Sequence, residues 1–194
     1  TGHKGLLGPQ GTGGIVLRED LARELTPLLS GGTGSMSHTE FMPEFLPDRL
    51  EAGTMNLPGL AGLHAALGFL QETGLDTIRA HELGLTKRFL NSLAPMQEDG
   101  RVKIIGLPGV KNRTGVVSVQ TPGRELAGIA AELDERFGIS TRVGLHCAPA
   151  AHKTLGTFPM GTLRFSFGFF NTEEDVDCAV SALDTLTKEA SHGF

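Results

Sequence analysis

Apolar residues recur at helical spacing in several stretches of the chain. The first begins near Glu19, and its leucines stay in register until the glycines at positions 31 and 32. Glycine just past the last apolar position favours a helix end, because it adopts the left-handed conformation at little cost. The predicted helices run from about 19 to 30, 58 to 73, 76 to 94, 126 to 137, and from a cap at Asn171 or Thr172 to at least 186.

Alternating or short continuous apolar runs predict strands between these helices. In residues 162–169, Leu163 and three phenylalanines occupy every second position, which is typical of a strand with one buried face. A loop is expected around Cys147, where small residues and proline follow. Shorter runs predict strands at 102–105, 116–120 and 140–143, and a buried strand at 13–17.

The order of these elements predicts an α/β protein made of unequal parts. Residues 100–194 contain the strands and helices of a complete small domain, with antiparallel strands covered on one side by helices. Residues 1–75 do not, because the apolar run at 13–17 needs neighbouring strands on both sides. They are predicted to be the tail of a larger sheet, with residues 76–99 as a connecting helix and linker.

Composition and charge exclude several classes of partner. The formal net charge is −5 and the pI is about 5.8, and Lys and Arg are scattered, so no basic surface for nucleic acid is indicated. No apolar run approaches the roughly 18 residues needed to cross a bilayer, and the start is not typical of a signal peptide. We therefore expect a cytoplasmic protein with no membrane or nucleic-acid partner.

Cysteine and histidine usage points to separate thiols and to no metal site. The two cysteines, Cys147 and Cys178, are too few for a disulfide framework or a zinc site. The seven histidines form no pair at ligand spacing on one helix, and His146 with His152 lacks a third ligand nearby. Cys178 is expected to pack within the last helix, whereas no apolar stripe includes Cys147.

Four short segments carry a family resemblance. They are Thr1-Gly-His-Lys-Gly, Glu51-Ala-Gly-Thr-Met-Asn, Arg142-Val-Gly-Leu-His-Cys-Ala-Pro, and Arg164 followed by Asn171-Thr-Glu-Glu. Each is a weak signal alone, but together they follow one order along nearly the whole chain. In this order and spacing the chain resembles the class V aminotransferases, specifically their cysteine desulfurases.

This resemblance implies a fold and a place in a longer protein. In that family the lysine of the first segment lies near the middle of the chain, so the sequence is expected to be the C-terminal half of a pyridoxal 5'-phosphate (PLP) transferase. It would then consist of the tail of the large domain and the small α/β domain. By itself it is expected to bind the cofactor weakly or not at all, since Lys4 lies at the chain end.

The resemblance also assigns cofactor-binding roles in the first part of the chain. Lys4 would hold PLP covalently and move the Cα proton of the substrate, a role that needs a reactive amine. Thr1 and His3 would contact the cofactor phosphate, for which a hydroxyl and an imidazole offer donors. Thr54 would reach the phosphate of a partner subunit, which implies a homodimer.

The remaining roles fall in the last third of the chain. Cys147 would take sulfur from the substrate as a persulfide, and its polar loop beside His146 suits a thiolate. Arg164 would bind the substrate carboxylate through its planar guanidinium. Arg142 and His146 are weaker candidates for substrate binding, since a strand arginine is equally well explained as an exposed side chain.

The predicted activity is therefore PLP-dependent conversion of L-cysteine to L-alanine with transfer of sulfur to Cys147, and from there to an acceptor protein. Two alternatives stay open. The same fold and cofactor could serve transamination or a selenocysteine lyase. The chain could also be a non-catalytic folding or interaction fragment.

Overall fold

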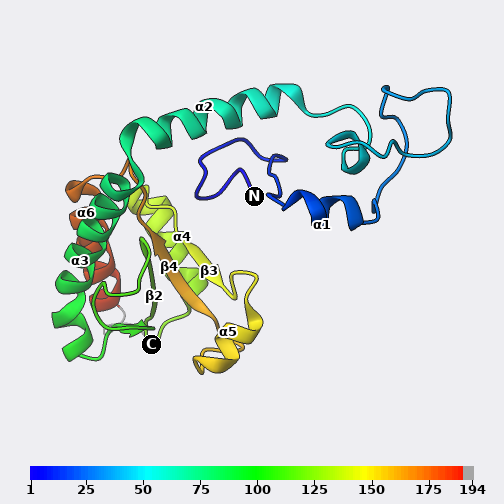
Figure 1. Cartoon of the computed structure of the whole chain (residues 1–194). Coiled ribbons are helices and arrows are strands. Elements are labelled where there is room, and N and C mark those ends of the chain that lie inside the picture. Colours follow the sequence, from blue (N-terminus) through cyan, green and yellow to red (C-terminus); the bar gives the residue numbers. More distant parts are fainter. Residues whose placement is uncertain (190–194) are drawn as a thin grey trace. The chain divides into compact units, whose positions relative to one another are not determined.

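The computed structural model describes residues 1–189 and divides into two compact units, Thr1–Gly74 and Leu75–Phe194 (Figure 1). The first unit contains α1 (Glu19–Glu24), a 3-10 helix (Asp48–Leu50) and α2 (Leu57–Thr73). The second contains α3 (Leu75–Glu98), β1 (Lys103–Ile105), β2 (Val116–Gln120), α4 (Leu126–Phe137), β3 (Arg142–Gly144), α5 (Pro149–Thr154), β4 (Thr162–Ser166) and α6 (Glu173–Glu189). The division predicted at residues 75 and 99 stays a prediction.

The second unit is built on a four-stranded sheet. Its strand order is β1-β2-β4-β3, and every neighbouring pair is antiparallel. Side chains from α3, α4 and α6 join those of β2 and β4 in one buried cluster, so the helices cover one face of the sheet (Figure 1). The predicted α/β class with a small antiparallel sheet is confirmed.

Strand periodicity places the core on that covered face. Leu163 and Phe165 of β4 are buried, and their register partners in β2 are Val119 and Val117. The ring of Phe165 lies 4.8 Å from that of Phe89 on α3, measured between centroids. Since side chains alternate across a strand, Arg164 between them belongs to the face away from the helices.

Local signals read from the sequence define the C-terminal end of α4 and the N-terminal end of α6. After α4, Gly138 adopts the left-handed conformation, and its N–H donates to the carbonyl of Asp134 at 2.9 Å, as in an αL motif. Before α6, Thr172 and Asp175 exchange hydrogen bonds between side chain and backbone, at 3.2 and 3.0 Å. Thr172, one of the two expected caps, is therefore the capping residue.

Replacement of Thr172 by alanine is expected to lower the free energy of unfolding by about 1 kcal/mol, because the N–H of Asp175 loses its acceptor. Thr172→Ser keeps the oxygen and serves as the control. Urea unfolding followed by circular dichroism measures both. An equal loss in the two variants would show that the hydroxyl is not what stabilises the helix end.

The predicted strand at 13–17 is wrong. The segment is not a strand, and Ile15 and Val16 are 83% and 101% exposed. A strand needs a neighbour to accept its backbone hydrogen bonds, and no strand of residues 1–189 pairs with it. The helix predicted after it begins at Glu19 as expected but ends at Glu24, because Pro27 lacks an N–H and restricts the residue before it.

Three boundaries in the second unit also differ from expectation. Helix α3 continues past Pro95 to Glu98, since the burial of Leu93 and Met96 on either side outweighs one lost hydrogen bond. Strand β3 starts only at Arg142, where its pairing with β4 begins, and the hydroxyl of Ser140 before it donates to Asp134 on α4. Strand β4 ends at Ser166, two residues before the N–H of Gly168 donates to the side chain of Asn171 and the chain turns.

In the first unit the opening loop packs closely on α2. The side chain of Asn56 caps this helix by accepting from the N–H of Gly59 at 3.1 Å. A Cβ at Gly62 would lie only 2.6 Å from Cγ of Pro9, so this contact requires glycine.

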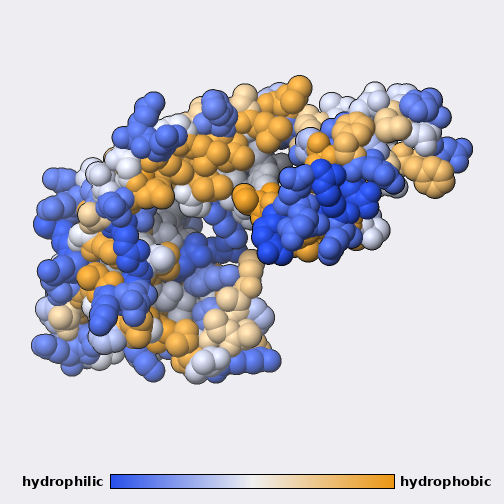
Figure 2. All heavy atoms as spheres, viewed as in Figure 1, coloured by the Kyte–Doolittle hydropathy of each residue, from blue (hydrophilic) through white to orange (hydrophobic). Residues whose placement is uncertain are grey.

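Much of the apolar surface of the first unit is nevertheless exposed, as Figure 2 shows along α2, where Leu57 is 66% exposed. No helix within residues 1–189 is long and apolar enough to cross a membrane.

Candidate active site

Cys147 occupies a strained turn between β3 and α5. Both His146 and Cys147 have positive φ, 51° and 61°, and the N–H of Ala148 donates to the carbonyl of Leu145 at 2.8 Å. Two consecutive left-handed residues closed by this bond are the signature of a type I′ turn, which glycine or asparagine normally provides. This conformation costs histidine and cysteine roughly 1–3 kcal/mol each. Such strain is typical of functional sites.

The turn brings the sulfur of Cys147 to a guanidinium. Nη2 of Arg142 donates to Sγ at 3.6 Å, and Cys147 is exposed to solvent. A cationic donor at this distance stabilises negative charge on sulfur, and the thiolate is the nucleophilic form of cysteine. The accessible thiol with this contact makes Cys147 the candidate nucleophile of the second unit.

His146 is held in the same turn by the strand before it. Its Nε2 lies 3.0 Å from the carbonyl oxygen of Arg142 and donates to it. Burial lowers the pKa of His146 below its ordinary value; the hydrogen bond to Arg142 opposes this, while the positive charge of Arg164 and the proximity of His152 add to the lowering. His146 is therefore neutral at pH 7, and its Nδ1 is left as an acceptor.

Arg164 lies beside Arg142 on the open face of the sheet. The two arginines are direct register partners across β3 and β4, and Ser118 flanks Arg164 on the other side. Like charges placed opposite each other are unfavourable in an antiparallel pair. Neither arginine forms an ion pair with any group in residues 1–189, where the salt bridges involve other side chains.

Two buried polar atoms on this face lack partners. Nε of Arg164 and Oγ1 of Thr162 are both buried, and neither has a hydrogen-bond partner among the described residues. Thr162 and Arg164 are two positions apart on β4 and so share the face that carries Arg142. Buried polar atoms in native proteins are almost always satisfied by protein groups or by ordered water, so these two atoms are available to a bound water or to a ligand. Paired guanidinium groups favour an anion such as a carboxylate.

The segment Thr1–Lys4 forms an exposed turn in the first unit. The N–H of Gly2 donates to the carbonyl of Thr12, and the N–H of Leu7 donates to that of Lys4, at 2.8 and 2.9 Å. The side chains of Thr1, His3 and Lys4 are exposed and unpaired within residues 1–189. Their hydroxyl, imidazole and amine are all available to a ligand.

Thr54 lies in a different loop of the same unit. Its neighbour Gly53 donates through its N–H to the carbonyl of Gly31 at 3.2 Å, and Thr54 itself is exposed. No hydrogen bond within residues 1–189 joins Thr54 to Lys4 or to the turn that holds it. Thr1, His3 and Lys4 are thus exposed in one turn, and Thr54 is exposed in another loop of the same unit.

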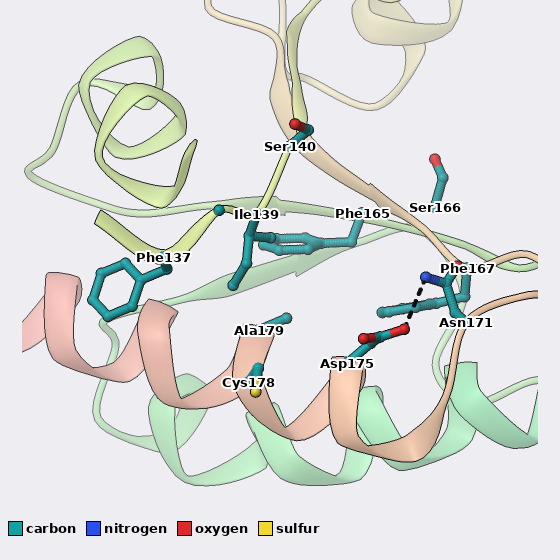
Figure 3. A pocket seen from close by; sticks show the side chains of 11 residues that line it. Phe137, Ile139, Ser140, Phe165, Ser166, Phe167, Asn171, Asp175, Cys178 and Ala179 are labelled. Carbon is teal, nitrogen blue, oxygen red and sulfur yellow. Dashed lines mark hydrogen bonds between the residues drawn. The ribbon is translucent and has the colours of Figure 1, made fainter. Parts of the chain in front are cut away.

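Cys178 is not packed as expected. It is exposed and lines a cavity of about 360 Å³ between the end of α4, the last residues of β4 and the start of α6 (Figure 3). It faces away because Val176, Ala179 and Leu183 form the buried side of α6. Its polar neighbours Asn171 and Asp175 are hydrogen bonded to each other at 3.2 Å.

Sequence reasoning missed two residues that the structure brings to the turn of Cys147. His152 is buried on α5, a helix that was expected to be loop, and Thr157 is buried just after it. Proline at the start of α5 followed by alanines is a helix signal that could have revealed it. Nothing in the sequence pattern marks Thr157.

Comparison with known proteins gives this geometry a context. A probable cysteine desulfurase of Methanothermobacter thermautotrophicus is 33% identical over 188 residues, which cover 95% of this chain and 46% of that protein. The apo structure of the cysteine desulfurase from Thermococcus onnurineus NA1 matches with a TM-score of 0.86 and 34% identity, over 97% of this chain and 46% of that one. The chain thus spans about half the length of the relatives it matches.

The fold is shared more widely. A mutant of C-DES with glycine covalently linked to its PLP cofactor matches with a TM-score of 0.70 at 23% identity, over 94% of this chain and 44% of that one. The sequence profile of aminotransferase class V matches residues 1–178, which include both the Thr1–Lys4 turn and the arginine-flanked Cys147. The chain therefore belongs to the class V aminotransferase family.

Proposed function

We propose that this chain provides the sulfur-accepting part of a PLP-dependent cysteine desulfurase. The observation that carries the proposal is the exposed, strained Cys147 with Arg142 on its Sγ and the unpaired Arg164 alongside. Relatives named cysteine desulfurases support it. The substrate is L-cysteine, and the products are L-alanine and a persulfide on Cys147.

The residues of the first turn fit PLP. An unpaired amine is the group that an aldehyde requires, and Lys4 offers one. Thr1 and His3 place a hydroxyl and an imidazole beside it, which suit a phosphate. Lys4 would hold the cofactor covalently and move the Cα proton of the substrate. When bound, PLP supplies the acceptor for the electron pair that this proton leaves behind.

The residues of the second unit carry the sulfur step. The Sγ thiolate of Cys147 forms an S–S bond with the substrate sulfur while the substrate C–S bond breaks. The electron pair of that bond stays on carbon, which takes up a proton and becomes the methyl group of alanine. Arg142 stabilises the thiolate before attack through its contact with Sγ. His146, whose pKa is lowered by burial, is proposed to accept the thiol proton at Nδ1.

Arg164 is assigned to the substrate carboxylate. Its buried Nε has no partner within residues 1–189, and a bidentate carboxylate satisfies such a guanidinium. Arg164→Gln is expected to raise KM for cysteine on the order of 10–100-fold with a smaller change in kcat, because a charge-assisted contact of about 1.5–3 kcal/mol is lost. Steady-state alanine formation measures this.

Exposed Arg18 in the first unit provides the matched control for that variant. Arg18→Gln removes one guanidinium and is expected to leave KM unchanged. A fall in kcat alone in Arg164→Gln would argue against carboxylate binding at this arginine.

The partners follow from the same assignment. Thr54, exposed and unattached to the turn of Lys4, is proposed to reach the cofactor phosphate of a second copy in a homodimer. The persulfide on exposed Cys147 is proposed to pass to an acceptor protein. Both belong to the complete polypeptide in which this sequence occurs.

One experiment tests the function as a whole. The complete polypeptide is loaded with PLP, given cysteine, quenched with an alkylating agent and digested for mass spectrometry. We expect alanine in solution and one additional sulfur atom on the Cys147 peptide. Formation of a keto acid instead of alanine would favour transamination, and unchanged cysteine would leave the non-catalytic alternative.

A further inference from the structure

A buried side-chain pair stands beside the turn of Cys147. His152 is 6% exposed and Thr157 is 2% exposed. Nδ1 of His152 lies 2.7 Å from Oγ1 of Thr157, so one hydrogen is shared between these atoms. The N–H of Thr157 also donates to the carbonyl of His152 at 2.9 Å. The two bonds fix the imidazole of His152 to the chain that follows α5.

An unbroken series of contacts leads from this pair to the sulfur. The rings of His152 and His146 are 5.5 Å apart between centroids, at an angle of 60°. His146 donates to the carbonyl oxygen of Arg142 at 3.0 Å, and the guanidinium of Arg142 donates to Sγ of Cys147 at 3.6 Å. Each step is a direct contact between neighbouring groups in the second unit.

The turn needs such support. Positive φ is uncommon for residues other than glycine, and two consecutive left-handed residues such as His146 and Cys147 persist only where the surrounding structure holds them. Of the two, His146 is the more buried, and its ring packs on that of His152. If the ring of His152 were free to rotate, His146 would lose the surface that keeps it in place.

We propose that His152, held by Thr157, is a positioning residue that keeps the His146–Cys147 turn in the conformation in which Arg142 reaches Sγ. His152 does not touch the sulfur and acts through His146. The proposal rests on the proposed function only in treating Cys147 as the nucleophile. The charged or titratable groups that face His146 are Arg142 from β3, Arg164 from β4 and His152 from α5.

The test measures the reactivity of Cys147 without cofactor or substrate. The complete polypeptide and its Thr157→Val and Thr157→Ser variants are alkylated with iodoacetamide from pH 6 to roughly pH 10.5, where free thiols are ionised. Mass spectrometry reads Cys147 and Cys178 separately. Thr157→Val keeps the shape and removes the hydroxyl, so Cys147 is expected to react about fivefold more slowly near pH 7.

The pH profile distinguishes positioning from simple access. The fivefold difference is expected to narrow toward pH 10.5, where free thiols in general are ionised. Thr157→Ser is expected to match the parent, and Cys178 to react alike in all three proteins. In an Arg142→Ala background, Thr157→Val is expected to have no further effect, since the contact that it weakens is already gone.

Several results would overturn the proposal. They are equal rates for Thr157→Val and the parent, a difference that persists unchanged at high pH, a full additional effect in Arg142→Ala, or a matching change at Cys178. If Thr157→Val folds poorly, the Thr157→Ser variant provides the test, and slower alkylation of Cys147 in Thr157→Ser would contradict the proposal. If the desulfurase proposal is wrong, turnover will not depend on Cys147. The alkylation rates of Cys147 would then still test the role of His152.

Discussion

Replacing Cys147 by serine is expected to abolish transfer of sulfur from cysteine, lowering turnover on the order of 100-fold or more. A serine hydroxyl stays protonated at neutral pH and cannot hold sulfur as a persulfide. The contact from Arg142 then faces a neutral oxygen in place of a thiolate. Sulfide release in the presence of a reducing thiol, together with alanine formation, measures the loss.

Cys178 provides a matched control within the same unit. It is also a free, exposed cysteine. However, it lies on α6 and lines a cavity whose lining residues include no arginine. Cys178→Ser is expected to retain full turnover. Undiminished sulfide release in Cys147→Ser would contradict the desulfurase proposal and would favour the lyase or transaminase alternatives.

Loss of Lys4 is expected to have the largest effect of all. Lys4→Ala removes the amine that would hold PLP and move the Cα proton, so activity is expected to fall by at least about 1,000-fold. Borohydride treatment of the PLP-loaded protein should fix the cofactor on the peptide that contains Lys4, and should fix none there in the variant. Mass spectrometry of the digested protein reads the attachment.

Two controls separate chemistry from charge and from surface lysine reactivity. Lys4→Arg keeps the positive charge but cannot attach an aldehyde in the same way, so it is expected to behave like Lys4→Ala. Lys87 is an exposed lysine on α3, and Lys87→Ala is expected to leave both the label and the activity intact. Cofactor fixed at another lysine in the parent protein would show that Lys4 is not the attachment site.

The elements that could be predicted are those whose signals are local. Strand β2 has the predicted bounds because its alternation is complete within five residues. Helices α2 and α4 end where Gly74 and Gly138 stop them, since a C-terminal glycine acts through its own backbone. These features depend on residues close in sequence, so the pattern alone suffices.

The elements that were wrong are those decided by distant partners or competing local signals. The apolar run at 13–17 is not a strand because nothing in the described residues pairs with it. Pro95 does not end α3 because burial of Met96 holds the last turn. Cys178 is exposed because Val176, Ala179 and Leu183 form the buried side of α6 and position 178 lies outside it.

By itself, the sequence determined the family and the candidate functional groups. The order of the short segments around Lys4, Cys147 and Arg164 can be recognised without knowledge of the fold. Only the tertiary structure showed that Arg142 reaches Sγ and stands opposite an unpaired Arg164. It also revealed the buried His152–Thr157 pair beside the turn. Register across a sheet and the φ of a turn residue depend on atoms many positions apart, and one-dimensional spacing does not encode which of them meet.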